Sequence, residues 1–179
     1  MNRPNLSRPM GVLTKEEIFK AIEDGRIEID PYKPEFVGPG SVDLHLGNQF
    51  RTFQKLHQIY HVTDESDFQQ ITQLEEVDDY FVLMPGETVL GVTVERIKLA
   101  PSLCGRLEGR SRFARLGLMV HITAGFMQPG INNHQVLEIS NVSSIPLALH
   151  PGTRMCQFIF ETCVGEATYS GRFANQIIP

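Results

Sequence analysis

The first pattern in the chain is helical. Three apolar residues near the N-terminus recur at the spacing of one helical face: Ile18, Ala21 and Ile22. Thr14 and Glu17 ahead of them form a T-x-x-E capping box, and Gly25 after them is a natural C-terminal stop. These signals predict a short helix over 13–25.

A different pattern follows, in which short apolar or alternating runs are separated by turn residues. The runs are 42–46, 80–84, 89–94, 136–141, 146–149 and 155–160. The turns between them are Pro85-Gly86, Pro129-Gly130, Asn132-Asn133, Ser143-Ser144 and Pro151-Gly152. Many short strands with such turns favour a mainly β fold, either a sandwich, a jelly roll or a small barrel.

Two segments depart from this pattern. The stretch 56–79 is polar and acidic, and we interpret it as an insertion with a helix around 67–74. The stretch 165–179 has little apolar periodicity and is predicted to be a tail. It is either disordered or a lid that orders over a ligand. The 179 residues suit a single domain over 1–179.

Composition narrows the class of protein. Hydrophobic residues make up 41% and charged residues 21% of the chain, as in ordinary globular domains. The net charge of −5 argues against a non-specific nucleic-acid binder. No apolar run approaches the length of a membrane span, and the N-terminus lacks the apolar core of a signal peptide. We therefore expect a cytoplasmic protein with no membrane partner.

The sequence lacks the motifs of several common kinds of binding and catalytic site. The three cysteines (Cys104, Cys156 and Cys163) show no CxxC spacing, so we interpret them as reduced, buried thiols. The six histidines show no metal-ligand spacing, and each is interpreted as a surface or satisfied core residue. The sequence has no P-loop, no GxGxxG, no GxSxG and no zinc-deaminase signature.

Candidate functional residues are most concentrated in the stretch GRLEGRSRFARLGL at 105–118. It contains four arginines close together in the sequence: Arg106, Arg110, Arg112 and Arg115. Clustered arginines with glycines and Ser111 are typical of a polyphosphate site, because guanidinium groups bind phosphate oxygens bidentately. A solvated, ion-paired surface is the alternative, and composition alone does not separate the two.

Glu138 is the second candidate. It lies between Leu137 and Ile139 in a run that otherwise suits a buried strand. If its neighbours face the core, Glu138 faces the opposite side, which is solvent, a pocket or a subunit interface. A carboxylate in a partly dry pocket has a raised pKa and can move protons near neutral pH.

These residues together resemble the dCTP deaminases of the trimeric dUTPase superfamily. The resemblance covers nearly the whole chain, in this order: GSVDLHLGNQFRTF at 40–53, MPGE at 84–87, GRSRFARLGLMVHITAGF at 109–126, VLEISN at 136–141, LHPGTRMCQFIFE at 149–161 and YSGRFANQ at 169–176. It implies a homotrimer of distorted β-barrel or jelly-roll subunits whose active sites are shared between neighbouring chains.

The resemblance also implies a reaction, the zinc-free deamination of dCTP to dUTP and ammonia, with Mg²⁺ accompanying the nucleotide and dTTP as an inhibitor. Glu138 would take a proton from water and pass it toward the pyrimidine and the leaving ammonia. Ser111, Arg115 and the carbonyl of Ala124 would hold the water and polarise the base. The remaining substrate-binding residues implied are Arg110, Arg112, Thr123, Gln128, Gln157, Tyr169, Arg172 and Gln176.

Two positions depart from the family pattern. Gln128 stands where the family usually has an Asp that recognises the sugar hydroxyl and, in the dUTP-hydrolysing relatives, activates water. An amide cannot act as a base, so we expect no diphosphatase step. Arg112 replaces a serine near the phosphates and adds a charge. The alternatives are a dUTP diphosphatase, a bifunctional enzyme that forms dUMP, and a non-catalytic nucleotide-binding homologue.

Overall fold

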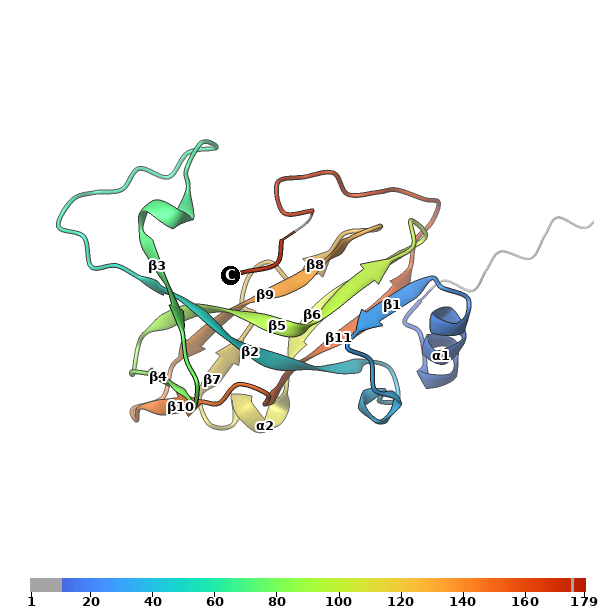
Figure 1. The fold of residues 1–179 in the computed structure, drawn as a ribbon, viewed down its shortest axis with the longest axis horizontal. Helices are drawn as coiled ribbons and strands as arrows, with labels where there is room; N and C mark the ends of the chain where they lie inside the picture. The colour runs from blue at the N-terminus through green and yellow to red at the C-terminus, as the bar shows by residue number, and fades with distance from the viewer. Residues whose placement is uncertain (1–10, 175) are drawn as a thin grey trace, which may run out of the picture.

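The computed structural model describes residues 11–174 and 176–179. Strands dominate it, and two short α-helices and two 3-10 turns (η) flank them (Figure 1). In chain order the elements are α1 (Lys15–Glu23), β1 (Ile27–Asp30), η1 (Pro34–Phe36), β2 (Val42–Phe53), η2 (Phe68–Gln70), β3 (Thr72–Glu76), β4 (Phe81–Leu83), β5 (Thr88–Leu99), β6 (Leu103–Gly109), α2 (Ser111–Ala114), β7 (Leu118–Val120), β8 (Phe126–Met127), β9 (Asn132–Asn141), β10 (Leu147–Leu149) and β11 (Arg154–Thr162).

Nine strands form one antiparallel sheet in the order β7-β9-β5-β2-β11-β6-β8, with β1 added to β5 and β3 added to β2. The two end strands of this order do not pair with each other, so the sheet curls into an open half-barrel. Strands β4 and β10 pair separately. The predicted mainly β architecture with a short N-terminal helix is therefore confirmed.

The hydrophobic core is formed mainly by alternate residues of the sheet strands. Its largest fully buried side chains include Phe50, Phe158 and Phe160, which come from the long central strands β2 and β11. Helix α1 adds Ile18 and Ala21, both with no exposed surface, as the helical spacing predicts. In the described part of the chain, no helix is both long and apolar enough to span a bilayer.

Two local predictions were wrong in detail. Thr14 is the N-cap of α1, but its side chain makes no capping hydrogen bond, so the predicted capping box does not form. The predicted helix around 67–74 is a single 3-10 turn followed by β3, in which Leu74 pairs with Arg51 of β2. The long edge of β2 offers this segment backbone partners, and such tertiary pairing outweighs a local helical preference.

Candidate active site

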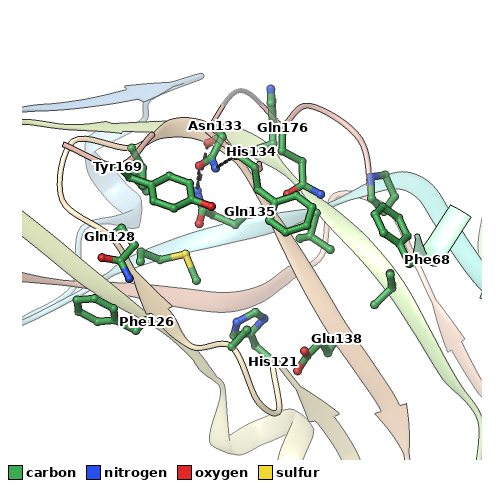
Figure 2. Close-up of a pocket in the computed structure, with 17 residues that line it drawn as sticks. Phe68, His121, Phe126, Gln128, Asn133, His134, Gln135, Glu138, Tyr169 and Gln176 are labelled. Atoms are coloured by element: carbon green, nitrogen blue, oxygen red, sulfur yellow. Dashed lines mark hydrogen bonds between the residues drawn. The ribbon is translucent and has the colours of Figure 1, made fainter. Parts of the chain in front are cut away.

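The structure contains a cavity of about 440 Å³ between β9, the segment 121–131 and the C-terminal segment 169–179 (Figure 2). Its walls include an acid, a histidine, two amide side chains and a tyrosine: Glu138, His121, Gln128, Gln176 and Tyr169. Apolar residues supply much of the remaining lining, among them Phe126 and Val136. A concave, largely apolar site with a few convergent polar groups is typical of a small-molecule site.

Glu138 lies at this cavity because of strand alternation. Leu137 and Ile139 have no exposed surface, and Glu138 points to the opposite face of β9, toward the cavity. Its Oε2 accepts hydrogen bonds from the backbone amides of Ile122 at 3.0 Å and Thr123 at 2.6 Å, and its Oε1 accepts one from the Thr123 hydroxyl at 2.6 Å. Within the single chain, Glu138 therefore faces a pocket rather than open solvent.

The expected raised pKa of Glu138 is contradicted. Partial burial raises the pKa of this carboxyl, but the Thr123 hydroxyl, the amides of Thr123 and Ile122 and the nearby His121 each lower it. The net pKa lies below the ordinary value for Glu, because four stabilising contacts to the charged form outweigh the loss of hydration. In this structure Glu138 is an ionised acceptor whose oxygens are both engaged.

His121 is a cavity residue that sequence reasoning missed. Its backbone has φ of 60°, a left-handed conformation that is uncommon outside glycine, and its amide donates to the carbonyl of Glu138 at 2.7 Å. Both ring nitrogens are buried and neither has a hydrogen-bond partner among the described residues. A buried imidazole without partners facing a cavity is the kind of group that a ligand or water satisfies.

The C-terminal segment covers the cavity. The amide of Tyr169 donates to Pro129, Asn133 donates to the carbonyl of Phe173, and the amide of His134 donates to the carbonyl of Gln176. Tyr169 and Gln176 thereby reach the cavity, as their assignment to substrate binding predicts, while Asn175 lies outside the described residues. The described residues of this tail are hydrogen-bonded to the segments around the cavity, and its action as a lid over a ligand stays a prediction.

Arg172 does not reach the cavity. Its guanidinium pairs with Asp67 at 3.2 Å and donates to the carbonyl of Ser66 at 3.3 Å, both in the segment that precedes η2. The acidic insertion therefore holds the one arginine that the sequence assigns to the tail. A triphosphate contact by Arg172 needs this surface ion pair to open, which costs at most about 1 kcal/mol for an exposed pair.

The predicted phosphate-binding residues gather elsewhere in the chain. Arg110 follows β6, and Gln157 of β11 donates to the carbonyl of Gly109 at 3.4 Å. Gln157 also lies directly opposite Asp43 of β2, to which Arg110 is ion-paired at 3.1 Å. Arg110 and Gln157 are far apart in the sequence and are both predicted to bind phosphate, and the fold places them close together.

The remaining predicted catalytic residues, Ser111 and Arg115, begin and directly follow α2, and the predicted substrate-binding residue Arg112 lies between them. Ser111, Arg112 and Arg115 are all exposed, and none of them lines the cavity. In Figure 1, α2 lies at the bottom of the view, whereas the C-terminus and β8 lie nearer its centre. The predicted residues of one chain therefore fall into two groups. What we call the cavity group comprises the lining residues Ala124, Gln128, Glu138, Tyr169 and Gln176 together with Thr123, which is hydrogen-bonded to Glu138; the arginine group comprises Arg110, Ser111, Arg112, Arg115 and Gln157.

Metal ligands do not cluster in this structure. Among residues 11–174 and 176–179, no three side chains of His, Cys, Asp or Glu come together as a metal site would need. Cys104 and Cys156 are buried, as expected, whereas Cys163 is half-buried. Burial raises the pKa of Cys104 to about 11, so its thiol is a poor ligand and nucleophile at neutral pH.

Comparison with known proteins identifies the family of this chain. The family model described as dCTP deaminase-like matches residues 12–163. Three relatives named "dCTP deaminase, dUMP-forming" are 41% identical in Parafrankia sp. (92% of this chain, 86% of the relative), 43% in Thermobifida fusca (82% and 75%) and 42% in Methanosphaera stadtmanae (86% and 80%).

A solved structure shares the fold. The 2'-deoxycytidine 5'-triphosphate deaminase from Agrobacterium tumefaciens superposes with a TM-score of 0.69 at 18% identity, over 87% of this chain. The chain spans about half the length of that protein, 49%. The family model covers most of the chain, and the relatives exceed 40% identity over most of their own lengths. This chain therefore belongs to the dCTP deaminase-like family.

Proposed function

We propose that the protein deaminates dCTP with water, giving dUTP and ammonia. The observation that carries this proposal is Glu138, a carboxylate that faces a cavity of nucleoside size within the segment matched by the family. The relatives named as dCTP deaminases support the substrate. A cavity with a titratable group of perturbed pKa is the usual place for proton-transfer chemistry.

In the proposed reaction Glu138 removes a proton from water, and the hydroxide adds to C4 of cytosine. The carboxyl passes this proton to the ring nitrogen N3, which gives a tetrahedral carbon bearing a hydroxyl and the amine. It then takes the proton of that hydroxyl and delivers it to the amine, so that the C4–N bond breaks, ammonia leaves with the bonding electrons and the C4 carbonyl forms. The backbone carbonyl of Ala124, at the cavity wall, would orient the water. One group serves as base and acid only if its pKa lies near the working pH.

The pKa of Glu138 must therefore rise when the substrate binds. A nucleotide that fills the cavity excludes water from the carboxylate, and this raises its pKa. We propose that a catalytic water displaces the hydroxyl of Thr123 from Glu138, because this hydroxyl belongs to an exposed side chain and is the easiest of the three donors to move. This exchange would be the role of Thr123 in substrate binding.

The separation of the two groups supports a shared site. Ser111 begins α2 and Arg115 directly follows it; both are exposed and neither lines the cavity of its own chain, so they are available to a neighbouring copy. We propose a homotrimer in which the arginine group of one subunit completes the cavity group of its neighbour. Ser111 and Arg115 would then polarise the water and the base, and Arg110 with Gln157 would bind phosphates.

A magnesium ion bound with the nucleotide neutralises phosphate charge. Since the described residues offer no cluster of metal ligands, we propose that the phosphates hold the ion. Arg112 adds a cation beside the same phosphates, and Arg172 would leave Asp67 to close over them. An analogue such as dTTP would inhibit by occupying the same cavity.

Gln128 bears on the product. Its side chain is exposed at the cavity and has no hydrogen-bond partner among the described residues, so its amide is available for a sugar hydroxyl. An amide accepts no proton from water, which favours release of dUTP. The relatives named dUMP-forming favour a second candidate, in which dUTP is hydrolysed further to dUMP.

Glu138→Gln tests the proposal. This variant keeps the size and one hydrogen-bond acceptor of the side chain but cannot take a proton. We expect ammonia release from dCTP to fall by about 10²–10⁴-fold, the usual contribution of general acid–base catalysis. Calorimetric binding of dCTP should stay within a few-fold of that of the unmodified protein. Undiminished turnover by Glu138→Gln would contradict the proposed role.

A further inference from the structure

A cluster of ionised side chains lies where β2, β6 and β11 meet. Asp43 Oδ2 pairs with Nη2 of Arg110 at 3.1 Å and with Nη1 of Arg154 at 3.4 Å. Nη1 of Arg110 also donates to the backbone carbonyl of Arg154 at 3.0 Å. One carboxylate oxygen thus holds two guanidinium groups side by side; we call these three residues the Asp43 cluster.

A β-bulge places Arg154 in this cluster. On β11 Cys156 pairs with Leu44 of β2 and Arg154 pairs with His45, so Met155 is an extra residue between them. Met155 and Cys156 are both buried, at 2% and 0% exposure. Without the extra residue, Met155 would occupy the face that Arg154 now shares with Asp43. Bulges commonly redirect a side chain in this way.

The cluster carries more positive charge than its own residues neutralise. Two arginines share one carboxylate, and no second carboxylate pairs with either guanidinium among the described residues. The neighbouring acid, Glu95, is engaged by His45, whose backbone amide donates to it at 2.8 Å. Several guanidinium N–H groups therefore remain available, and such donors suit an anion with several oxygens.

Arg154 is the more open of the two arginines, since 43% of its side chain is exposed against 21% for Arg110. Its guanidinium lies 5.7 Å from the centre of the Phe36 ring, and that ring packs edgewise on His45 at 4.5 Å. A planar cation held between a carboxylate and an aromatic ring loses little freedom when it binds a ligand. Arg154 is thus both preorganised and accessible.

We propose that Arg154 binds the polyphosphate of the nucleotide together with Arg110, and that Asp43 is a positioning residue for both arginines. The inference rests on the proposed function, because it places the phosphates at the arginine group that includes Arg110 and Gln157. It adds two residues to that group. Gln157 faces Asp43 across the strand pair, so all four side chains share one face.

Inorganic tripolyphosphate is the probe, with dCTP and dCMP as nucleotides. Arg154→Gln should weaken tripolyphosphate binding and raise KM for dCTP, each by about tenfold, the value of one charge-assisted contact. kcat should be unchanged and dCMP affinity less affected. Arg154→Lys keeps the charge but loses the bidentate geometry of the guanidinium. Its KM for dCTP and its affinity for tripolyphosphate should lie between those of Arg154→Gln and of the unmodified protein. Arg26→Gln is the matched control, because it removes an arginine paired with Asp24 elsewhere on the surface.

Asp43→Asn separates positioning from simple charge. If Asp43 merely repels the anion, its removal tightens tripolyphosphate binding; if Asp43 positions the arginines, its removal weakens that binding. We expect weakening, with a smaller effect in the Arg154→Gln background than alone. Tighter binding would overturn the positioning role. Arg154 is exposed, so its variants decide the main inference even if Asp43→Asn fails to fold.

Failure of this inference is distinct from failure of the proposed function. A protein that deaminates dCTP but whose Arg154→Gln variant matches Arg26→Gln in KM and in tripolyphosphate affinity would overturn the inference alone. A protein that does not deaminate dCTP would overturn the proposed function, and tripolyphosphate binding would still report on Arg154.

Discussion

The contact between Thr123 and Glu138 gives a quantitative test of the site. The Thr123 hydroxyl donates to a carboxylate oxygen at 2.6 Å and helps to hold the pKa of Glu138 below its ordinary value. Thr123→Val removes the donor and keeps the shape of the side chain. Hydrogen bonds to charged groups contribute about 1.5–3 kcal/mol, and the exposure of Thr123 reduces this to about 1 kcal/mol. Loss of this hydrogen bond therefore raises the pKa of Glu138 toward its ordinary value.

The direction of the change in stability follows from the linkage between protonation of Glu138 and folding. A depressed pKa in the folded protein stabilises it above the unfolded pKa, and this stabilisation is lost as the pH falls through the folded pKa. Thr123→Val should therefore lower the free energy of unfolding by about 1 kcal/mol at pH 7, and by much less in acid where Glu138 is protonated. Protein concentration must be held constant, since the proposed assembly would contribute to stability.

The assay is a carbon-13 NMR titration of the Glu138 carboxyl, assigned with Glu138→Gln, together with urea unfolding at two pH values. Thr123→Ser is the matched control, because it keeps the hydroxyl and should titrate as the unmodified protein does. An unchanged Glu138 titration in Thr123→Val would refute the claim that this hydroxyl stabilises the ionised carboxylate.

Three further predictions concern assembly, product and packing. Mixing Ser111→Ala and Glu138→Gln chains under exchange conditions should restore part of the activity that each lacks alone, and no restoration would contradict a shared site. Gln128→Asp should increase conversion of dUTP to dUMP, measured by ion-exchange chromatography; an unchanged rate would mean that Gln128 does not decide the product. Gly105→Ala should lower the free energy of unfolding by about 1–3 kcal/mol, because a Cβ would lie 2.1 Å from a buried phenylalanine ring. Gly40→Ala, whose Cβ would meet nothing closer than 3.8 Å, is the control, and an equal loss in both variants would refute the packing explanation.

Alternation in the sequence predicted the orientation of Glu138 because both of its neighbours are apolar and belong to a central strand. Period-2 reasoning is reliable there, since burial of Leu137 and Ile139 leaves Glu138 only one face. The same reasoning could not anticipate the pKa of Glu138. The two amides that lower it come from Ile122 and Thr123, and only the folded chain brings them to the carboxylate.

The insertion shows the opposite case. The stretch around 67–74 carries a mild helical pattern, but β3 forms because the edge of β2 is available to pair with it. In the sequence, His121 is only one of six scattered histidines. The structure shows that it lines the cavity, because of the turn before Ile122. Arg154 lies beside Asp43 only because of the bulge at Met155. The local sequence contains no signal that predicts this change of register.

The central claim is most directly tested by the products that form from dCTP. The purified protein would be incubated with dCTP and magnesium, and separately with dUTP, and the nucleotides resolved by ion-exchange chromatography while ammonia is assayed in parallel. The account predicts equal amounts of ammonia and dUTP from dCTP, with dUTP itself left intact. Formation of dUMP would contradict the expectation drawn from Gln128, and the absence of ammonia from dCTP would contradict the proposed function.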